Sequence, residues 1–320
     1  MDTEKKYQIM RIARKYYELN MGQSEIAKEE GISKSTVSRL LQKAMDLGYI
    51  KISIEYPLES CIDVAAQMKE TFHLKDVFIT PVLVDNETVI LQDTCRALGD
   101  RLDTYVHDED IICVSWGTTM NCLSDYIRSL QAQHLKIVQM NGGVSKFNIP
   151  TGAQKIVDAL VTASKGDGYL FPVPAVVDSK EISDVLKKDS QVKNILEMAR
   201  KANVTIFSVG SMNQDIILYR VNYLNDQDMK QLMDRGSVGD IASRFFNARG
   251  EIADPSLDGR VVGLELRELK EKDCNICVAV GKNKVKSILA ALRGGYIHVL
   301  YSDEKTAREV LQEYYREIDQ

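Results

Sequence analysis

A short polar segment at residues 33–39 has the chemistry of a nucleic-acid contact. Its four hydroxyl side chains and two cations are Ser33, Lys34, Ser35, Thr36, Ser38 and Arg39. Hydroxyls and cations donate hydrogen bonds to phosphate oxygens, and arginine also binds guanine edges in the major groove of DNA. The alternative is an ordinary three-helix cap with a solvated polar face. The concentration of short donors and cations at one helix start favours DNA binding.

Three helices that would position this segment are predicted from apolar residues at helical spacing, at residues 4–20, 23–30 and 34–47. Ala27, Gly31 and Val37 are four and then six residues apart, which resembles the helix-turn-helix motif. A small alanine lets two helices approach, and Gly31 can leave its helix through a left-handed conformation. Ser33 is a good N-cap for the third helix.

Residues 49–55 alternate between apolar and polar side chains, which predicts a strand that forms a wing. Lys51 on this strand is expected to contact a DNA phosphate. The pattern changes after Tyr56 and Pro57. We therefore predict two domains, a winged helix-turn-helix domain at residues 1–56 and a larger domain at residues 57–320.

In the larger domain, short apolar runs alternate with amphipathic segments. The predicted strands are residues 77–79, 111–114, 137–138, 169–171, 204–208, 276–280 and 298–301. The predicted helices are residues 87–106, 119–130, 153–163, 191–202, 284–292 and 304–315. This alternation predicts an α/β fold with a Rossmann-like, doubly wound, mostly parallel sheet. Residues 241–263 depart from it and predict a hairpin insertion, with turns at Arg249-Gly250 and Asp258-Gly259.

Four junctions that follow predicted strands carry polar groups and glycines, and ligands bind at such strand ends in open α/β sheets. Gly117, Thr118 and Thr119 stand at a helix start, where free backbone N–H groups attract phosphate. Lys284 opens another helix and could neutralise the same phosphate. The alternatives are a routine strand-to-helix turn and a solvated lysine.

The other two junctions suit the hydroxyl groups of a sugar. Gln139 and Asn141 offer amide donors and acceptors, and Gly142 permits close approach of a ligand. Asp240 offers a carboxylate beside a glycine. The alternatives are a glycine turn and an aspartate that only stabilises its turn.

Composition excludes several classes of protein. The chain has 320 residues and a net charge of −5, and residues 1–55 contain ten Lys or Arg against eight Asp or Glu, so a polyanion would bind the first domain. The sequence contains no run of about 18 apolar residues, so no membrane span is predicted. Six cysteines form no repeated CxxC pair, and although Cys274 and Cys277 could hold a metal, buried thiols are the preferred interpretation. We expect a cytoplasmic protein without a metal or cofactor.

The first domain, together with the motifs VSWGTT, MNGG and RGSVGDIASRFFNARGEI, resembles the SorC family of bacterial transcriptional regulators, in particular its deoxyribonucleoside-regulator (DeoR) branch. The resemblance covers essentially the whole chain. It implies a winged helix-turn-helix, an effector domain related to sugar-phosphate isomerases, and a homo-oligomer, usually a tetramer, that binds operator DNA. It also implies that Gly117, Thr118, Thr119 and Lys284 hold a phosphate, and that Gln139, Asn141 and Asp240 contact the sugar.

One departure concerns how the effector is held. Some members of the deoxyribose branch bind the aldehyde as an imine, through a lysine immediately before the Gly-Gly pair. That position is Asn141 here, and Lys146 is the nearest lysine. We therefore expect reversible, noncovalent binding.

The resulting hypothesis is a repressor of a carbohydrate or nucleoside catabolic operon that a phosphorylated sugar, such as deoxyribose 5-phosphate, releases from its operator. An activator with the same effector is an alternative. A sugar-phosphate isomerase or deaminase is disfavoured because none of the four histidines stands at the four junctions. A third alternative is a DNA-binding protein whose larger domain binds no ligand.

Overall fold

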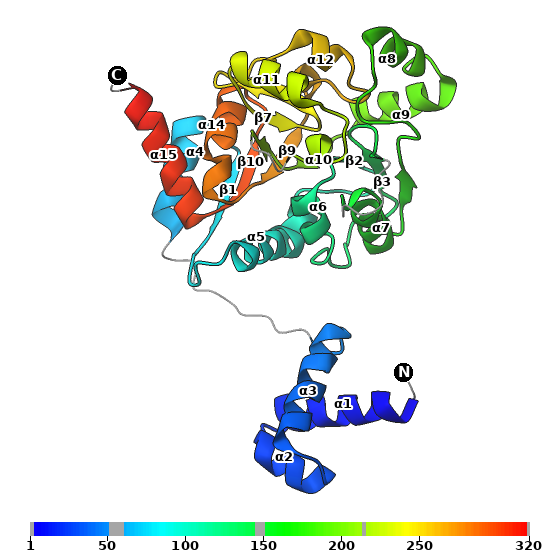
Figure 1. Ribbon diagram of the computed structural model, residues 1–320, viewed down its shortest axis with the longest axis vertical. Helices are drawn as coiled ribbons and strands as arrows, with labels where there is room; N and C mark the ends of the chain where they lie inside the picture. The colour runs from blue at the N-terminus through cyan, green and yellow to red at the C-terminus, as the bar shows by residue number, and fades with distance from the viewer. Residues whose placement is uncertain (1–2, 51–60, 145–150, 213–215, 319–320) are drawn as a thin grey trace. The chain divides into compact units, whose positions relative to one another are not determined.

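The computed structural model describes residues 3–50, 61–144, 151–212 and 216–318. The chain divides into two compact units, Met1–Pro57 and Leu58–Gln320 (Figure 1). Among the described residues, no helix is both long and apolar enough to cross a membrane.

The first unit has the predicted helix-turn-helix, with helices α1 Thr3–Tyr17, α2 Gln23–Glu30 and α3 Lys34–Asp46. Its core contains Ile12, Ile26 and Val37, each without exposed surface. Gly31 has φ of 67° and its N–H donates to Ala27, as a left-handed helix end requires. The predicted wing, including Lys51, lies outside the described residues.

An ion cluster that sequence reasoning did not foresee joins α1 to α2. Glu30 accepts from Arg11 at 2.6 Å and from Lys15 at 2.8 Å, and its side chain is 6% exposed. The hydrogen bonds from Arg11 and then Lys15 lower the pKa of Glu30 to about 2. The cluster therefore ties the first two helices to each other.

The second unit is built on a parallel seven-stranded sheet with the strand order β1-β10-β9-β5-β2-β3-β4. Its strands are β1 Asp76–Thr80, β2 Ile111–Val114, β3 Lys136–Gln139, β4 Asp167–Tyr169, β5 Val204–Phe207, β9 Cys274–Val278 and β10 Val299–Asp303. The order reverses between β2 and β5, because β2 leads outward to β3 and β4 whereas β5 leads the other way to β9. This arrangement confirms the predicted doubly wound α/β fold.

Helices cover both faces of this sheet (Figure 1). One face packs against α5 Glu87–Arg101, η2 Leu102–Thr104, α6 Thr118–Leu123 and α7 Ala153–Ser164. The other packs against α4 Ile62–Phe72, α9 Ser190–Arg200, α14 Val285–Arg293 and α15 Glu304–Ile318. The remaining helices are α8 Lys180–Leu186, α10 Ile217–Arg220, α11 Asp226–Asp234, α12 Pro255–Gly259, α13 Leu266–Leu269 and η3 Lys282–Lys284.

A small antiparallel sheet replaces part of the predicted hairpin insertion. Its strands are β6 Gly210–Ser211, β7 Ser237–Ile241 and β8 Arg244–Asn247. Its tight turn is at Ala242 and Ser243, both with positive φ. The predicted turn at Arg249-Gly250 is present, with Gly250 at φ 77°. The prediction of a second turn at Asp258-Gly259 was wrong, because that segment ends α12, whose N-cap Asp254 starts a helix.

Helix α6 is also shorter than predicted, since it ends at Leu123 rather than near residue 130. The chain there follows tertiary contacts instead. Leu130 N–H donates to Ala163, and a Cβ at Gly99 would lie only 2.2 Å from the backbone oxygen of Tyr126. Close packing of this segment on α5 and α7 therefore replaces the helical hydrogen bonds.

Candidate functional site

The polar start of α3 is ordered by its own hydroxyl groups. Ser33 accepts from Thr36 N–H at 3.1 Å, and its Oγ lies 2.9 Å from Ser35 Oγ. Arg39 donates weakly to Thr36 Oγ1 at 3.4 Å. Lys34, Ser35, Ser38 and Arg39 are exposed, and within the described residues neither cation makes an ion pair. The predicted recognition face is thus free to meet a polyanion.

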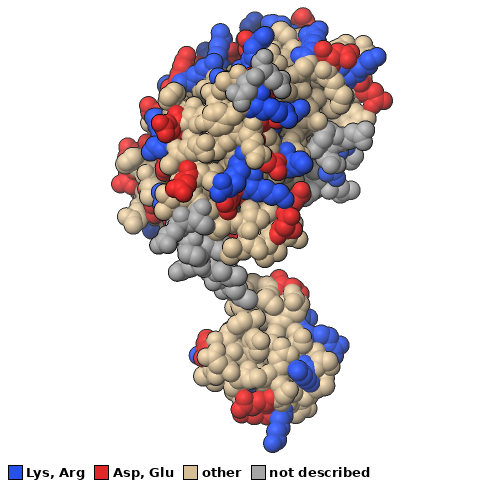
Figure 2. Space-filling view, turned by 90° about the vertical axis from the view of Figure 1, so that its left-hand side faces the viewer, with Lys and Arg blue, Asp and Glu red and all other residues tan. Residues whose placement is uncertain are grey.

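The larger unit presents a different surface. On the face shown in Figure 2, both cationic and anionic side chains are spread over the larger unit.

A cavity of about 260 Å³ lies beside the carboxyl ends of β2 and β5, where the strand order reverses. Its polar lining includes Ser115, Gly117, Thr118, Thr119, Ser208, Asp240, Ser243 and Lys284. Its apolar lining includes Trp116, Ile216, Ile217 and Leu218. Both a charged anion and a polyhydroxylated body would find partners in such a cavity.

Lys284 supplies a cation to this cavity from the end of η3, just before α14. Its Nζ donates to Ser208 Oγ at 3.0 Å and to Thr119 Oγ1 at 3.2 Å. Burial lowers the pKa of Lys284, while the nearby Cys277 and Asp240 oppose that shift. Because its two hydrogen-bond partners are neutral hydroxyls, its charge is available to an anionic ligand.

Gly117 brings the chain from β2 into α6. Its φ of 134° favours glycine, and no atom lies within 4 Å of the place where a Cβ would stand. Thr118 and Thr119 follow on the cavity wall. Because α6 is only six residues long, its helix dipole attracts phosphate weakly. The side chains of Thr118, Thr119 and Lys284 are the stronger attraction.

Asp240 lines the cavity and also holds the hairpin turn. Its Oδ2 accepts from Ser243 N–H at 3.0 Å, which is the turn-stabilising role considered as an alternative above. Burial raises the pKa of Asp240 to about 6, against the opposing effects of that hydrogen bond and of Lys284. Its other oxygen, Oδ1, lies so close to Gly210 that a Cβ at that glycine would stand 2.0 Å from it.

Three residues predicted to contact the sugar lie behind the cavity wall instead. Gln139 is buried and its Oε1 accepts from Phe171 N–H at 2.9 Å. Gly142 packs so tightly that a Cβ would lie 2.4 Å from the oxygen of Pro174. Asn141 has no exposed surface, and its Nδ2 donates to Ser243 Oγ at 2.9 Å. None of the three is among the described residues that line the cavity. Asn141 supports the Ser243 turn, whereas Gln139 and Gly142 pack against residues 171–174.

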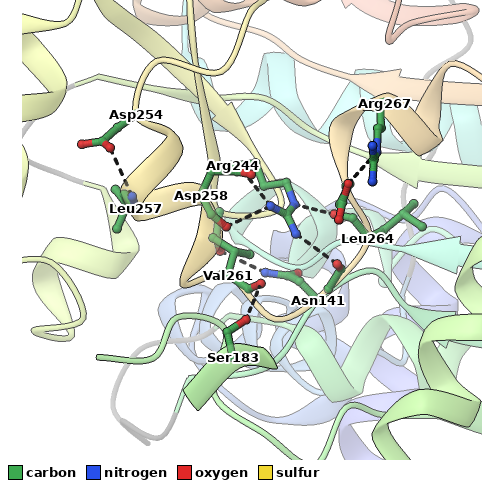
Figure 3. A network of polar contacts seen from close by, with 12 residues as sticks. Asn141, Ser183, Arg244, Asp254, Leu257, Asp258, Val261, Leu264 and Arg267 are labelled. Atoms are coloured by element: carbon green, nitrogen blue, oxygen red, sulfur yellow. Dashed lines mark hydrogen bonds and ion pairs between the residues drawn. The ribbon is translucent and has the colours of Figure 1, made fainter. Parts of the chain in front are cut away.

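A buried arginine that sequence reasoning missed organises this support (Figure 3). Arg244 is 1% exposed, and its guanidinium donates to the backbone oxygens of Leu264 and Gly263 and to Asp258 Oδ1. Gly263 in turn forms an antiparallel bridge with Asn141. Arg244 thereby ties the Ser243 turn to the chain that backs the cavity.

The missed lining residues have partial signals in the sequence. Ser115 and Trp116 lie inside the VSWGTT motif, and Ser208 is the last residue of a predicted strand. Ser243 and Arg244 lie in the long RGSVGDIASRFFNARGEI motif. Lys146, the nearest lysine to Asn141, lies outside the described residues.

Comparison with known families decides the class of protein. The family model "Putative sugar-binding domain" matches residues 56–312, and "Winged helix-turn-helix DNA-binding" matches residues 4–51. The chain belongs to the SorC family of transcriptional regulators.

Individual relatives of this SorC-family chain are also named as regulators. It is 34% identical to the deoxyribonucleoside regulator of Bacillus subtilis (strain 168), over 98% of this chain and 100% of that protein. It is 30% identical to the transcriptional regulator LsrR of Escherichia coli O157:H7, over 95% and 94% of the two chains. These relatives are regulators, which confirms the prediction of a transcriptional regulator rather than an enzyme.

A solved structure matches both units of this SorC-family chain. The full-length sorbitol operon regulator SorC from Klebsiella pneumoniae has a TM-score of 0.74 and 26% identity, and covers 97% of this chain and 99% of its own. A domain of a possible sugar-binding transcriptional regulator from Arthrobacter aurescens TC1 has a TM-score of 0.72 and 27% identity, with 81% and 100% covered.

Proposed function

We propose that this regulator represses a carbohydrate or nucleoside catabolic operon and that a phosphorylated sugar releases it from its operator. The observation that carries the effector class is the placement of Lys284 Nζ between the hydroxyls of Thr119 and Ser208, in a cavity that also exposes Asp240. The cation and hydroxyls suit a phosphate, and the carboxylate and serines suit sugar hydroxyls.

Deoxyribose 5-phosphate is one candidate effector, since the name of the Bacillus subtilis relative refers to deoxyribonucleosides. The Klebsiella relative is named for a sorbitol operon, so other phosphorylated sugars and polyols belong in the same comparison. Binding is noncovalent in this proposal, because Asn141 has no amine with which to form an imine.

The DNA contact in this proposal is made by Ser33, Lys34, Ser35, Thr36, Ser38 and Arg39 from α3, with Lys51. Two or more such segments from a cytoplasmic homo-oligomer, a tetramer by family resemblance, would grip successive half-sites of an operator. Effector binding would favour a different arrangement of the subunits. A coupling free energy of about 1–3 kcal/mol changes operator affinity by about 5- to 150-fold.

The test is fluorescence anisotropy of a labelled duplex from the region upstream of the chain's own coding sequence. We expect salt-sensitive binding that ribose, deoxyribose, hexose or polyol phosphates weaken by the factor above, and linkage requires DNA to weaken effector binding equally. A phosphorylated sugar that tightens DNA binding would indicate an activator instead. A chain whose melting temperature no phosphorylated sugar raises would support a larger domain without a ligand.

A further inference from the structure

Helix α5 and the segment that begins with α6 pack against each other in a constant register. A Cβ at Gly99 would stand 3.2 Å from the Cβ of Tyr126, which is 27 residues later in the chain. Arg128 Nε donates to Asp100 Oδ1 at 3.1 Å, across 28 residues. The two segments therefore run side by side in the same direction and approach closely at Gly99.

The same register places Cys95 opposite Cys122, again 27 residues apart and one helical turn before Gly99. Cys95 Sγ donates to the backbone oxygen of Thr119 at 3.7 Å, one turn before Cys122 on α6. The side chains of Cys95 and Cys122 are themselves hydrogen-bond partners, and both thiols are free. The pair therefore has the close side-chain approach that a disulfide requires.

The two thiols differ in exposure and acidity. Cys95 has no exposed surface, whereas Cys122 is partly exposed. The hydrogen bond with Cys95 lowers the pKa of the Cys122 thiol, and the same contact, followed by burial, raises the pKa of the Cys95 thiol. An accessible thiol of lowered pKa beside a second cysteine is typical of redox-sensitive sites, in which the second cysteine resolves the oxidised first one.

We propose that Cys95 and Cys122 form a redox modification site that a hydroperoxide converts to a disulfide. The Cys122 thiolate attacks a peroxide oxygen, the O–O bond breaks, and Cys122 becomes a sulfenic acid. The sulfur of Cys95 then attacks the sulfur of Cys122, and the hydroxyl group leaves with the proton of Cys95 as water. The two thiols lose two electrons and two protons, and hydrogen peroxide is reduced to two molecules of water.

This site is independent of the proposed effector, because neither cysteine is among the described residues that line the cavity. Its product would cross-link α5 to α6 and close a loop of 27 residues. A cross-link of this kind restricts the unfolded chain, so the oxidised protein should be the more stable form.

The experiment treats the full chain with near-stoichiometric hydrogen peroxide. Thiol titration of the denatured chain should show that the free thiols fall from six to four. Mass spectrometry of proteolytic peptides should find Cys95 linked to Cys122, and dithiothreitol should break that link. The melting temperature should rise by about 5 °C or more on oxidation and return after reduction.

Serine variants separate the two roles. Cys95→Ser should leave a sulfenic acid on Cys122 that dimedone traps, and Cys122→Ser, at a partly exposed position that tolerates the change if the buried one does not, should leave Cys95 unmodified. Cys274→Ser is the matched control, since Cys274 is another partly exposed cysteine, and it should still form the disulfide.

Three results would overturn the inference. They are six free thiols after treatment, a disulfide between any other pair of cysteines, and a melting temperature that falls on oxidation, which would show that the bond forms only in a distorted chain. None of these results bears on the proposed function, which is tested by DNA and sugar phosphates instead.

Discussion

Replacing Lys284 by methionine tests whether the amine of this partly buried residue binds the phosphate of the effector. Methionine keeps an unbranched apolar side chain and removes the charge. Only neutral hydroxyls, of Ser208 and Thr119, accept from Nζ among the described residues. If Lys284 holds the phosphate as proposed, the variant loses a charge-assisted contact with the ligand, and no ion pair among the described residues is broken.

The expected loss of affinity follows from the charge of this contact. A hydrogen bond to a charged group contributes about 1.5–3 kcal/mol. We therefore expect sugar-phosphate affinity to fall by about 10- to 150-fold. The effector concentration needed to release operator DNA should rise by the same factor.

The Lys284→Met substitution should raise the stability of the ligand-free chain or leave it unchanged. Burial lowers the pKa of Lys284 from its ordinary value of 10.5, so the protonated amine is less favourable in the folded than in the unfolded chain. This destabilisation is present at neutral pH and is relieved as the pH rises toward 10.5. Removing the amine removes the destabilisation, so the melting temperature should be unchanged or higher.

Calorimetric titration with ribose 5-phosphate and a thermal melt of the ligand-free chain together separate these effects. Lys282→Met is the matched control, because Lys282 is exposed in the same η3 segment and does not line the cavity. Wild-type affinity in Lys284→Met would refute the assigned role. A large drop in its melting temperature would show that the amine is structural.

Three further predictions concern other groups. Arg39→Ala should weaken operator binding by about 1–3 kcal/mol in anisotropy titrations, whereas Arg14→Ala on α1 should not, and equal losses would contradict the assignment to α3. Glu30→Gln should destabilise the first unit by about 1 kcal/mol at neutral pH; in chemical denaturation this difference should fade as the pH drops from 4.5 toward about 2, where Glu30 becomes protonated in the folded chain. Because burial raises the pKa of Asp240 from 3.8 to about 6, the folded chain loses stability as the pH rises through that window, and Asp240→Asn should flatten the slope there; an unchanged slope would show that Asp240 is solvated.

Much of the architecture could be predicted because its signals are local. The Ala27, Gly31 and Val37 spacing, the N-cap at Ser33 and the alternation of apolar runs with amphipathic segments are properties of neighbouring residues. They specify helices, turns and strands with little reference to the rest of the chain. The strand-end positions of Gly117, Thr118, Thr119, Asp240 and Lys284 followed from the same alternation, and the structure brings all five to one cavity.

What the sequence by itself determined, then, is the two-part organisation, the helix-turn-helix and the identity of the strand ends that carry polar groups. Tertiary structure alone decided which of those groups line the cavity. Asn141 and Gly142 follow β3 as Thr118 follows β2, yet Asn141 is bonded to Ser243, 102 residues away in sequence. Gln139, at the end of β3, is bonded to Phe171. Burial of Arg244 depends on the same long-range packing. Strand order and burial arise from contacts between distant segments, and no local pattern of residues encodes them.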